Sequence, residues 1–227
     1  MISFADIVLW VYATVLSVFV AFVIIVRGQL RRFSVLAMYF AIAAAVNLLR
    51  LHVFNTYGFT SREYGYFYYS SDLVLSVLLY FVLANLYREV FPAKSTHLHV
   101  RIGSALLVAG VGIFSFAILR TASSRLISRW IFEYRENLYF VSALGALLLF
   151  GVATYKSNST APVHQLSFVF AGYYLFFALM YMMQYASPRW TLGGLVGFFG
   201  MWLPLGVAYV FCDPDINKSL DDPYLPL

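Results

Sequence analysis

The sequence predicts an all-α polytopic membrane protein, a bundle of seven transmembrane helices. Of its 227 residues, 62% are hydrophobic and only 11% are charged, whereas soluble domains are nearer half apolar and a quarter charged. The hydrophobic residues are gathered into seven long runs, and a helix needs about 20 apolar residues to cross a bilayer. Backbone groups in hydrocarbon must be paired within their own segment, so runs of this length indicate helices rather than barrel strands.

The first three runs can be taken in chain order. Residues 3–26 have no basic region before them and no small-residue cleavage site after them, which indicates a retained span rather than a signal peptide. The second run, residues 33–54, follows the basic turn RGQLRR. The third, residues 70–87, follows the tyrosine-rich stretch YGFTSREYGYFYY. All three are long and apolar enough for a predicted span.

The fourth run, residues 102–119, is the shortest and holds no charge. The fifth, residues 137–155, follows the charged stretch 120–136, in which Arg125 and Arg129 are four apart. That spacing favours a short helix lying in the membrane interface. The last two runs are residues 165–186 and 190–212.

The chain is therefore predicted to contain one transmembrane domain, residues 1–212. Residues 213–227 read DPDINKSLDDPYLPL, which is polar and punctuated by proline. Such a segment buries too little apolar surface to fold by itself. We expect a disordered cytoplasmic tail.

The first connection predicts the orientation. It carries Arg27, Arg31 and Arg32, whereas nothing basic precedes the first span. Basic residues favour the cytoplasmic side, so we expect an outer amino terminus and a cytoplasmic carboxyl terminus. Over all connections the bias is slight, with eight basic residues on the cytoplasmic side and seven on the outer side. The seven are Arg50, Arg62, Arg120, Arg125, Arg129, Arg135 and Arg189.

Several classes of function are excluded. The single cysteine, Cys212, rules out an internal disulfide framework. The net charge of +5 comes from basic residues scattered at the ends of apolar runs, which gives no stripe that a nucleic acid could follow. No lysine in the seventh span could hold retinal, and no nucleophile, zinc or phosphate-loop motif occurs. The sequence predicts no enzyme, cofactor or metal.

Ionisable residues at membrane depth identify a candidate site. Asn47 and Arg50 are three apart and share a helix face, and Asp72 lies at a similar depth in the next span. An Arg50–Asp72 ion pair is therefore predicted. The charged residues Glu133, Arg135 and Glu136 lie on the same side of the membrane and are further candidates.

Two interpretations of this cluster are open. In one, it forms an outward-facing pocket for a small amphipathic or charged ligand, with walls made by Tyr64, Tyr66, Tyr68 and Tyr69. In the other, the ion pair only stabilises the bundle, and the tyrosines form an aromatic belt at the headgroups. The alternation of tyrosines over residues 64–68 also suits a short extended segment over the outer mouth.

Two further patterns have ordinary structural explanations beside functional ones. Glu133 and Glu136 could be metal ligands or an acid/base pair, but carboxylates at a helix start also favour the helix dipole. In the seventh span, Gly193 and Gly197 form a small-xxx-small face that permits close helix packing or an oligomer contact. Pro204 is expected to kink that helix.

Two stretches carry a resemblance to known proteins. They are RGQLRRFSVLAMYFAI, a basic turn followed by an aromatic span, and ISRWIFEYRENLYFVSALGALLLF, an arginine-bearing entry to the fifth span. The chain resembles a group of seven-helix hypothetical proteins of about this length in bacterial genomes, especially those of soil acidobacteria. The resemblance implies an inner-membrane location and no catalytic activity.

The expected function is a non-enzymatic membrane module that senses a ligand at the outer pocket or couples to partner proteins. The first alternative is a structural subunit of a larger membrane complex. The second is a small-solute transporter. The expected partners are the lipid bilayer and other membrane proteins, or a second copy of the chain, and not nucleic acid.

Overall fold

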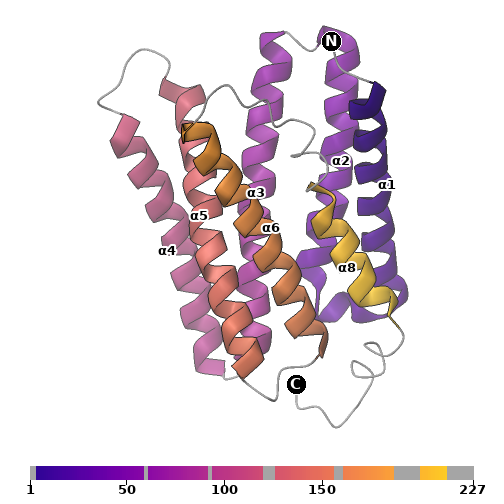
Figure 1. The fold of residues 1–227 in the computed structure, drawn as a ribbon, viewed down its shortest axis with the longest axis vertical. Coiled ribbons are helices and arrows are strands. Elements are labelled where there is room, and N and C mark those ends of the chain that lie inside the picture. Colours follow the sequence, from indigo (N-terminus) through magenta and orange to yellow (C-terminus); the bar gives the residue numbers. More distant parts are fainter. Residues whose placement is uncertain are drawn as a thin grey trace.

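The computed structural model describes residues 4–58, 61–91, 94–119, 126–155, 161–186 and 200–213, and every regular element in that part of the chain is a helix (Figure 1). The helices are α1 (Phe4–Val26), the short 3₁₀ helix η1 (Gln29–Arg31), α2 (Ser34–Tyr57), α3 (Arg62–Val90), α4 (Lys94–Leu119), α5 (Leu126–Tyr155), α6 (Ala161–Ala186) and α8 (Trp202–Cys212).

The described helices form a closed ring, and α4 lies outside it. Helix α1 packs on α2, α2 on α3, α3 on α5, α5 on α6, α6 on α8, and α8 back on α1. Helix α4 lies outside the ring, against α3 and α5. From α1 to α6 the chain alternates in direction, so α1, α3 and α5 begin at the same end of the bundle (Figure 1).

Among the residues that the structure describes, five helices are long and apolar enough to cross a membrane. The qualifying segments are Ser34–Tyr57, Arg62–Val90, Leu98–Ala117, Glu133–Tyr155 and Pro162–Met183. Two further apolar helical segments, Trp10–Val26 and Trp202–Cys212, are shorter. The prediction of a multi-pass helical membrane protein is confirmed at this level.

Helices α6 and α8 pack through small residues, as expected where lipid removes the hydrophobic drive for helix association. A Cβ atom placed on Gly206 of α8 would lie 2.6 Å from a methyl group of Val169 on α6. One on Gly172 of α6 would lie 3.2 Å from the indole nitrogen of Trp202, which donates a hydrogen bond to the Val169 carbonyl. Each of these two helices therefore packs a side chain directly onto a glycine of the other.

The tyrosine-rich stretch is helical, so the predicted extended segment is wrong. Helix α3 begins at Arg62 rather than near residue 70, because Ser61 caps it: its hydroxyl oxygen accepts a hydrogen bond of 3.0 Å from the backbone N–H of Tyr64. A serine in that position satisfies one of the unpaired N–H groups of the first turn. The tyrosines therefore follow a helical period, not an alternating one.

The predicted interfacial helix is also wrong over the residues that the structure describes. Residues 126–136 are the first turns of α5, which continues without a break to Tyr155. Glu133 is consequently the eighth residue of α5, and Glu136 the eleventh. The helix dipole favours carboxylates in the first turn of a helix. Both glutamates lie beyond that turn, so the dipole does not explain them.

The predicted packing face of Gly193 and Gly197 lies outside the described residues. Pro204 is the third residue of α8, because that helix begins at Trp202. Proline is tolerated in a first turn, whose N–H groups have no partner within the helix. Gly200 and Met201 are described and the helical run is interrupted at Met201, whereas residues 191–199 are outside the described part, so the kink expected at Pro204 stays a prediction.

Candidate functional site

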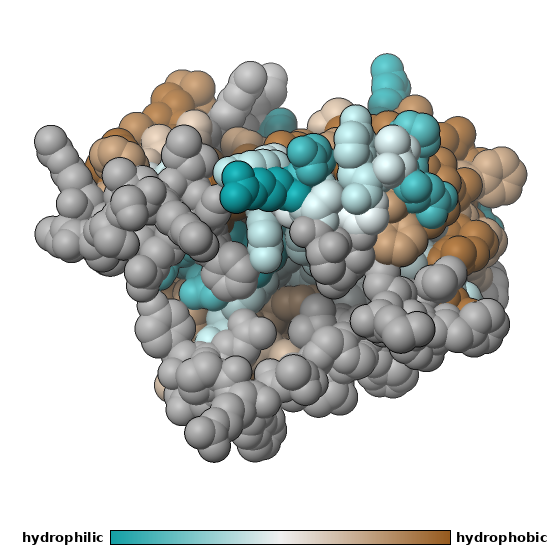
Figure 2. All heavy atoms as spheres, turned by 90° about the horizontal axis from the view of Figure 1, so that it is seen from above, coloured by the Kyte–Doolittle hydropathy of each residue, from teal (hydrophilic) through white to brown (hydrophobic). Residues whose placement is uncertain are grey.

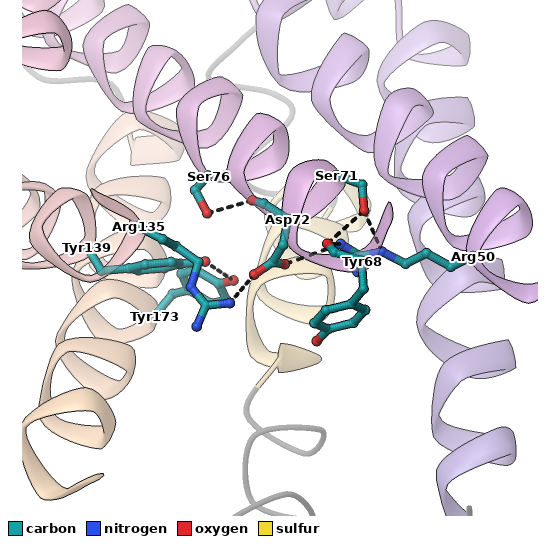
Figure 3. Close-up of polar contacts among 8 residues, drawn as sticks. All are labelled: Arg50, Tyr68, Ser71, Asp72, Ser76, Arg135, Tyr139 and Tyr173. Atoms are coloured by element: carbon teal, nitrogen blue, oxygen red, sulfur yellow. Dashed lines mark hydrogen bonds and ion pairs between the residues drawn. The ribbon is translucent and has the colours of Figure 1, made fainter. Parts of the chain in front are cut away.

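A shared carboxylate joins three helices in the half of the bundle where α1 begins. Asp72 on α3 accepts a hydrogen bond of 3.4 Å from Nη2 of Arg50 on α2, through Oδ1. Its other oxygen, Oδ2, accepts one from Nη1 of Arg135 on α5. Figure 3 shows Asp72 between the two guanidinium groups. The predicted Arg50–Asp72 pair is present, and Arg135 makes it a triad.

The three residues meet because they lie at similar depth. Asp72 is ten residues into α3, Arg135 is nine residues into α5, and Arg50 is seven residues before the end of α2. At about 1.5 Å per residue, these offsets place them about 10 to 15 Å from the ends of their helices.

Arg50 is held firmly. Only 7% of its surface is exposed. Its Nε donates to the Ser71 hydroxyl at 2.9 Å, and Nη2 donates to the Tyr68 carbonyl at 3.1 Å. The guanidinium carbon also lies 4.4 Å from the centre of the Tyr68 ring, a distance at which a cation is attracted to the ring face.

Arg135 is the arginine that borders open space. It is 8% exposed, and its guanidinium lies 5.0 Å from the centre of the Tyr181 ring on α6. Arg135 lines a cavity of about 370 Å³, which we call the Asp72 cavity. The cavity is lined by Tyr68, Tyr69, Asp72, Arg135, Tyr139, Tyr173, Phe177, Met180, Tyr181 and Gly200. Looking onto this end of the bundle, Figure 2 shows hydrophilic side chains gathered around a hollow.

Aromatic rings make up most of the wall opposite α3. Tyr173, Phe177 and Tyr181 stand four residues apart on α6 and so share one helix face. Tyr139 of α5 packs against this face, with its ring centre 5.4 Å from that of Phe177. The hydroxyl oxygens of Tyr139 and Tyr173 are 3.4 Å apart (Figure 3). The cavity thus has one charged wall and one aromatic wall.

The structure brings only part of the predicted site together. Of the four predicted wall tyrosines, Tyr68 and Tyr69 line the cavity. Tyr64 is buried against Phe54 of α2, and Tyr66 is 58% exposed on another face of α3.

Three other predicted residues do not line the Asp72 cavity. Asn47 lies half-buried on α2, about one turn before Arg50. Glu136 is buried and Glu133 is half-buried, and neither borders the cavity. Among the described residues, no three histidine, cysteine or acidic side chains gather as a metal site.

Six cavity residues were not identified from the sequence, and four of them are aromatic: Tyr139, Tyr173, Phe177 and Tyr181. Their signal is a spacing of four. Arg135 and Tyr139 are four apart on α5, and the three α6 residues repeat at the same interval. Within an apolar span such rings look like ordinary lipid-facing residues, so the spacing alone did not single them out.

The triad itself holds two arginines and one carboxylate. Asp72 contributes one negative charge, and Arg50 and Arg135 contribute two positive charges, so the triad alone carries a net charge of +1 (2 − 1). Glu133 and Glu136 add carboxylates beside Arg135 on α5, but they do not line the cavity. Arg135 is therefore the cationic group that a ligand in the cavity would meet.

The fold and site define the protein as a multi-pass helical membrane protein with a charged, aromatic cavity among its helices. Comparison with protein-family models, curated proteins and solved structures finds no match to this chain.

Proposed function

We propose that this chain is a non-enzymatic membrane module that binds a small ligand in the Asp72 cavity and passes the change to a partner protein. The observation that carries this proposal is the cavity itself. A space of about 370 Å³ borders two buried or half-buried charged side chains, Asp72 and Arg135, and a wall of aromatic rings. Ligand sites are of this kind: concave, largely apolar, and supplied with a few convergent polar groups.

A purely structural role explains less. An ion pair that only stabilises a bundle is best packed closely on every side, because open space beside it costs contacts. Here Arg135 and Asp72 both face a space that is large enough for a small molecule. The ligand-binding role is therefore preferred to that of a structural subunit.

The proposal includes a bundle of seven spans in a bacterial inner membrane, with the amino terminus outside. Arg50 and Arg135 are buried within the bundle and do not act as loop residues. Leaving these two out changes the count of basic residues from eight against seven to eight against five (7 − 2). That supports the orientation read from the first connection. In this orientation the cavity faces the outside.

The test is native mass spectrometry of the protein extracted gently from its own membrane, with a variant that fills the cavity. Gly200 lines the cavity, and a Cβ atom there meets nothing within 4 Å. Gly200→Phe should therefore extend a ring into the ligand space without a clash at its Cβ atom. Gly151→Phe is the matched control, because Gly151 is an exposed residue of α5 with equally open surroundings.

We expect a small molecule of constant mass on the wild-type protein and on Gly151→Phe, and its loss from Gly200→Phe. A wild-type protein that carries no small molecule, or the same molecule on all three proteins, contradicts the proposed function.

A further inference from the structure

We infer that the ligand of the Asp72 cavity is a small aromatic carboxylate, and that its carboxylate takes the place of the Asp72 carboxylate on Arg135. The inference rests on the proposed function and adds the chemical class of the ligand. Three features of the cavity carry it: its charge, the second partner of Asp72, and its rings.

The charge selects an anion. In the described part of the chain, the ionised side chains that line the cavity are Asp72 and Arg135, and Nη2 of Arg50 lies 3.4 Å from Oδ1 of Asp72. A bound carboxylate would give each arginine of the triad a carboxylate of its own, whereas a bound cation would compete with Arg135 for Asp72. Arginine is also the side chain best suited to a carboxylate, since its planar donors can bind both oxygens.

Arg50, the second partner of Asp72, allows a ligand carboxylate to replace Asp72 on Arg135. A buried carboxylate that loses its only cation becomes very unstable. Asp72 would not be left in that state, because Arg50 continues to donate to it. Arg50 itself is fixed by Ser71 and the Tyr68 carbonyl. Arg135 can therefore change its partner from Asp72 to the ligand without leaving a buried charge unpaired.

The rings and the volume select the body of the ligand. The lining contains five tyrosines and Phe177, together with Met180. Aromatic side chains pack favourably against another ring in offset or edge-to-face arrangements, and the thioether of Met180 adds to this. Since a water molecule takes about 30 Å³ of liquid, 370 Å³ has room for roughly twelve non-hydrogen atoms. A benzene ring with a short carboxylate chain is of this size.

The test measures binding of four matched probes to the full-length protein in lipid nanodiscs by isothermal titration calorimetry. The probes are phenylpropionate, its neutral amide, phenylpropylamine and the alkyl acid hexanoate. We expect phenylpropionate to bind at least about tenfold more tightly than each of the others, because only it satisfies both walls of the cavity.

Two variants locate the anion site. Arg135→Gln retains the Arg50–Asp72 pair, so the bundle should stay folded, and phenylpropionate and its amide should then bind equally. Asp72→Asn removes the carboxylate that competes for Arg135 and should tighten phenylpropionate about tenfold. Arg88→Gln is the control, because it removes one positive charge from the exposed far end of α3 and should leave all four affinities unchanged.

Several results would overturn the ligand class. They are an amide or amine that binds as well as the acid, a preference for the acid that survives Arg135→Gln, and no binding of any probe. The proposed function fails separately: a small molecule that depends on Gly200 but lacks a carboxylate leaves that function standing and removes only the ligand class.

Discussion

Asp72 and Arg135 stand 63 positions apart in the chain and share a charge-assisted hydrogen bond between α3 and α5. The same carboxylate also binds Arg50, 22 positions earlier, on α2. One acidic residue thus joins three neighbouring helices of the ring. Removing it affects all three at once, whereas removing either arginine leaves one ion pair intact.

Substitutions in the triad should show strong coupling. Asp72→Asn leaves two buried arginines without their carboxylate, which should cost about 3 to 5 kcal/mol of stability. Adding Arg50→Gln and Arg135→Gln should restore part of that loss, because the buried charges are removed together. Thermal unfolding of all combinations in one nanodisc composition measures the coupling. Losses that add without any recovery in the triple variant would show that the three residues do not act as a unit.

Gly206 should tolerate no larger side chain. A Cβ atom there would lie 2.6 Å and 2.7 Å from the two methyl carbons of Val169, and a valine in a helix has little freedom to turn away. Gly206→Ala should therefore destabilise the protein by about 1 to 3 kcal/mol. Val169→Ala in the same chain should relieve the clash.

Gly151→Ala is the control for this thermal unfolding experiment, because a Cβ atom on Gly151 meets nothing within 4 Å. It should be neutral, or stabilising by up to about 1 kcal/mol through better helix propensity. Equal effects of alanine at the two glycines would mean that α6 and α8 are not in close contact.

Helix α4 should loosen when two of its side-chain hydrogen bonds to α5 are removed, although a third, from Asn137 to the Ser115 hydroxyl at 3.0 Å, remains. Trp130 donates to the Gly112 carbonyl, and Tyr134 donates to the Val108 carbonyl, each at 3.1 Å. Replacing both with phenylalanine keeps aromatic rings in place and removes the two hydrogen bonds, which contribute about 0.5 to 1.5 kcal/mol each. Amide hydrogen exchange should quicken in α4 and stay unchanged in α1 and α2.

The control is Tyr12→Phe, which removes a hydroxyl from an exposed side chain of α1. Faster exchange throughout the bundle of the double variant would show that α4 is not an independently attached helix.

Cys212 can report the orientation of the chain. It is exposed at the end of α8, next to Phe211, whose ring centre lies 5.2 Å from that of Phe33 in the α1–α2 connection. Cys212 therefore lies at the end of the bundle that carries the first basic turn. With an outer amino terminus, a membrane-impermeant maleimide should not label it in intact cells and should label it in inverted vesicles.

Asn55→Cys in a Cys212→Ser chain is the counterpart, since residue 55 is exposed near the opposite end of α2. It should be labelled in intact cells. The reverse pattern of labelling would place the amino terminus inside.

Much of the fold could be predicted from hydropathy, and the boundaries of the helices could not. Apolar runs mark the part of a helix that meets lipid, but α3 and α5 continue well beyond it, to Arg62 and Leu126. Polar and aromatic residues outside the hydrocarbon add turns without adding hydropathy. For α3 a local signal existed, because Ser61 is a favourable cap.

The site was predictable only in part, for a different reason. Arg50 and Asp72 lie on consecutive spans, so their depth alone suggested a pair. Arg135 belongs to a later helix, and no local pattern says that α5 rather than another helix lies beside α3. The contact between Tyr139 and Tyr173 also depends on this arrangement of helices.

The shared carboxylate also has a consequence for biogenesis. Arg50 and Asp72 belong to one helical hairpin, α2 and α3, so that hairpin enters the bilayer with opposite charges close together. Arg135 leaves the ribosome later and meets a carboxylate that is already in place, which lowers the cost of burying a third charge. A rearranged gene that encodes α5 ahead of α3 would have to insert Arg135 before its counter-charge, and should give a poorly inserted chain.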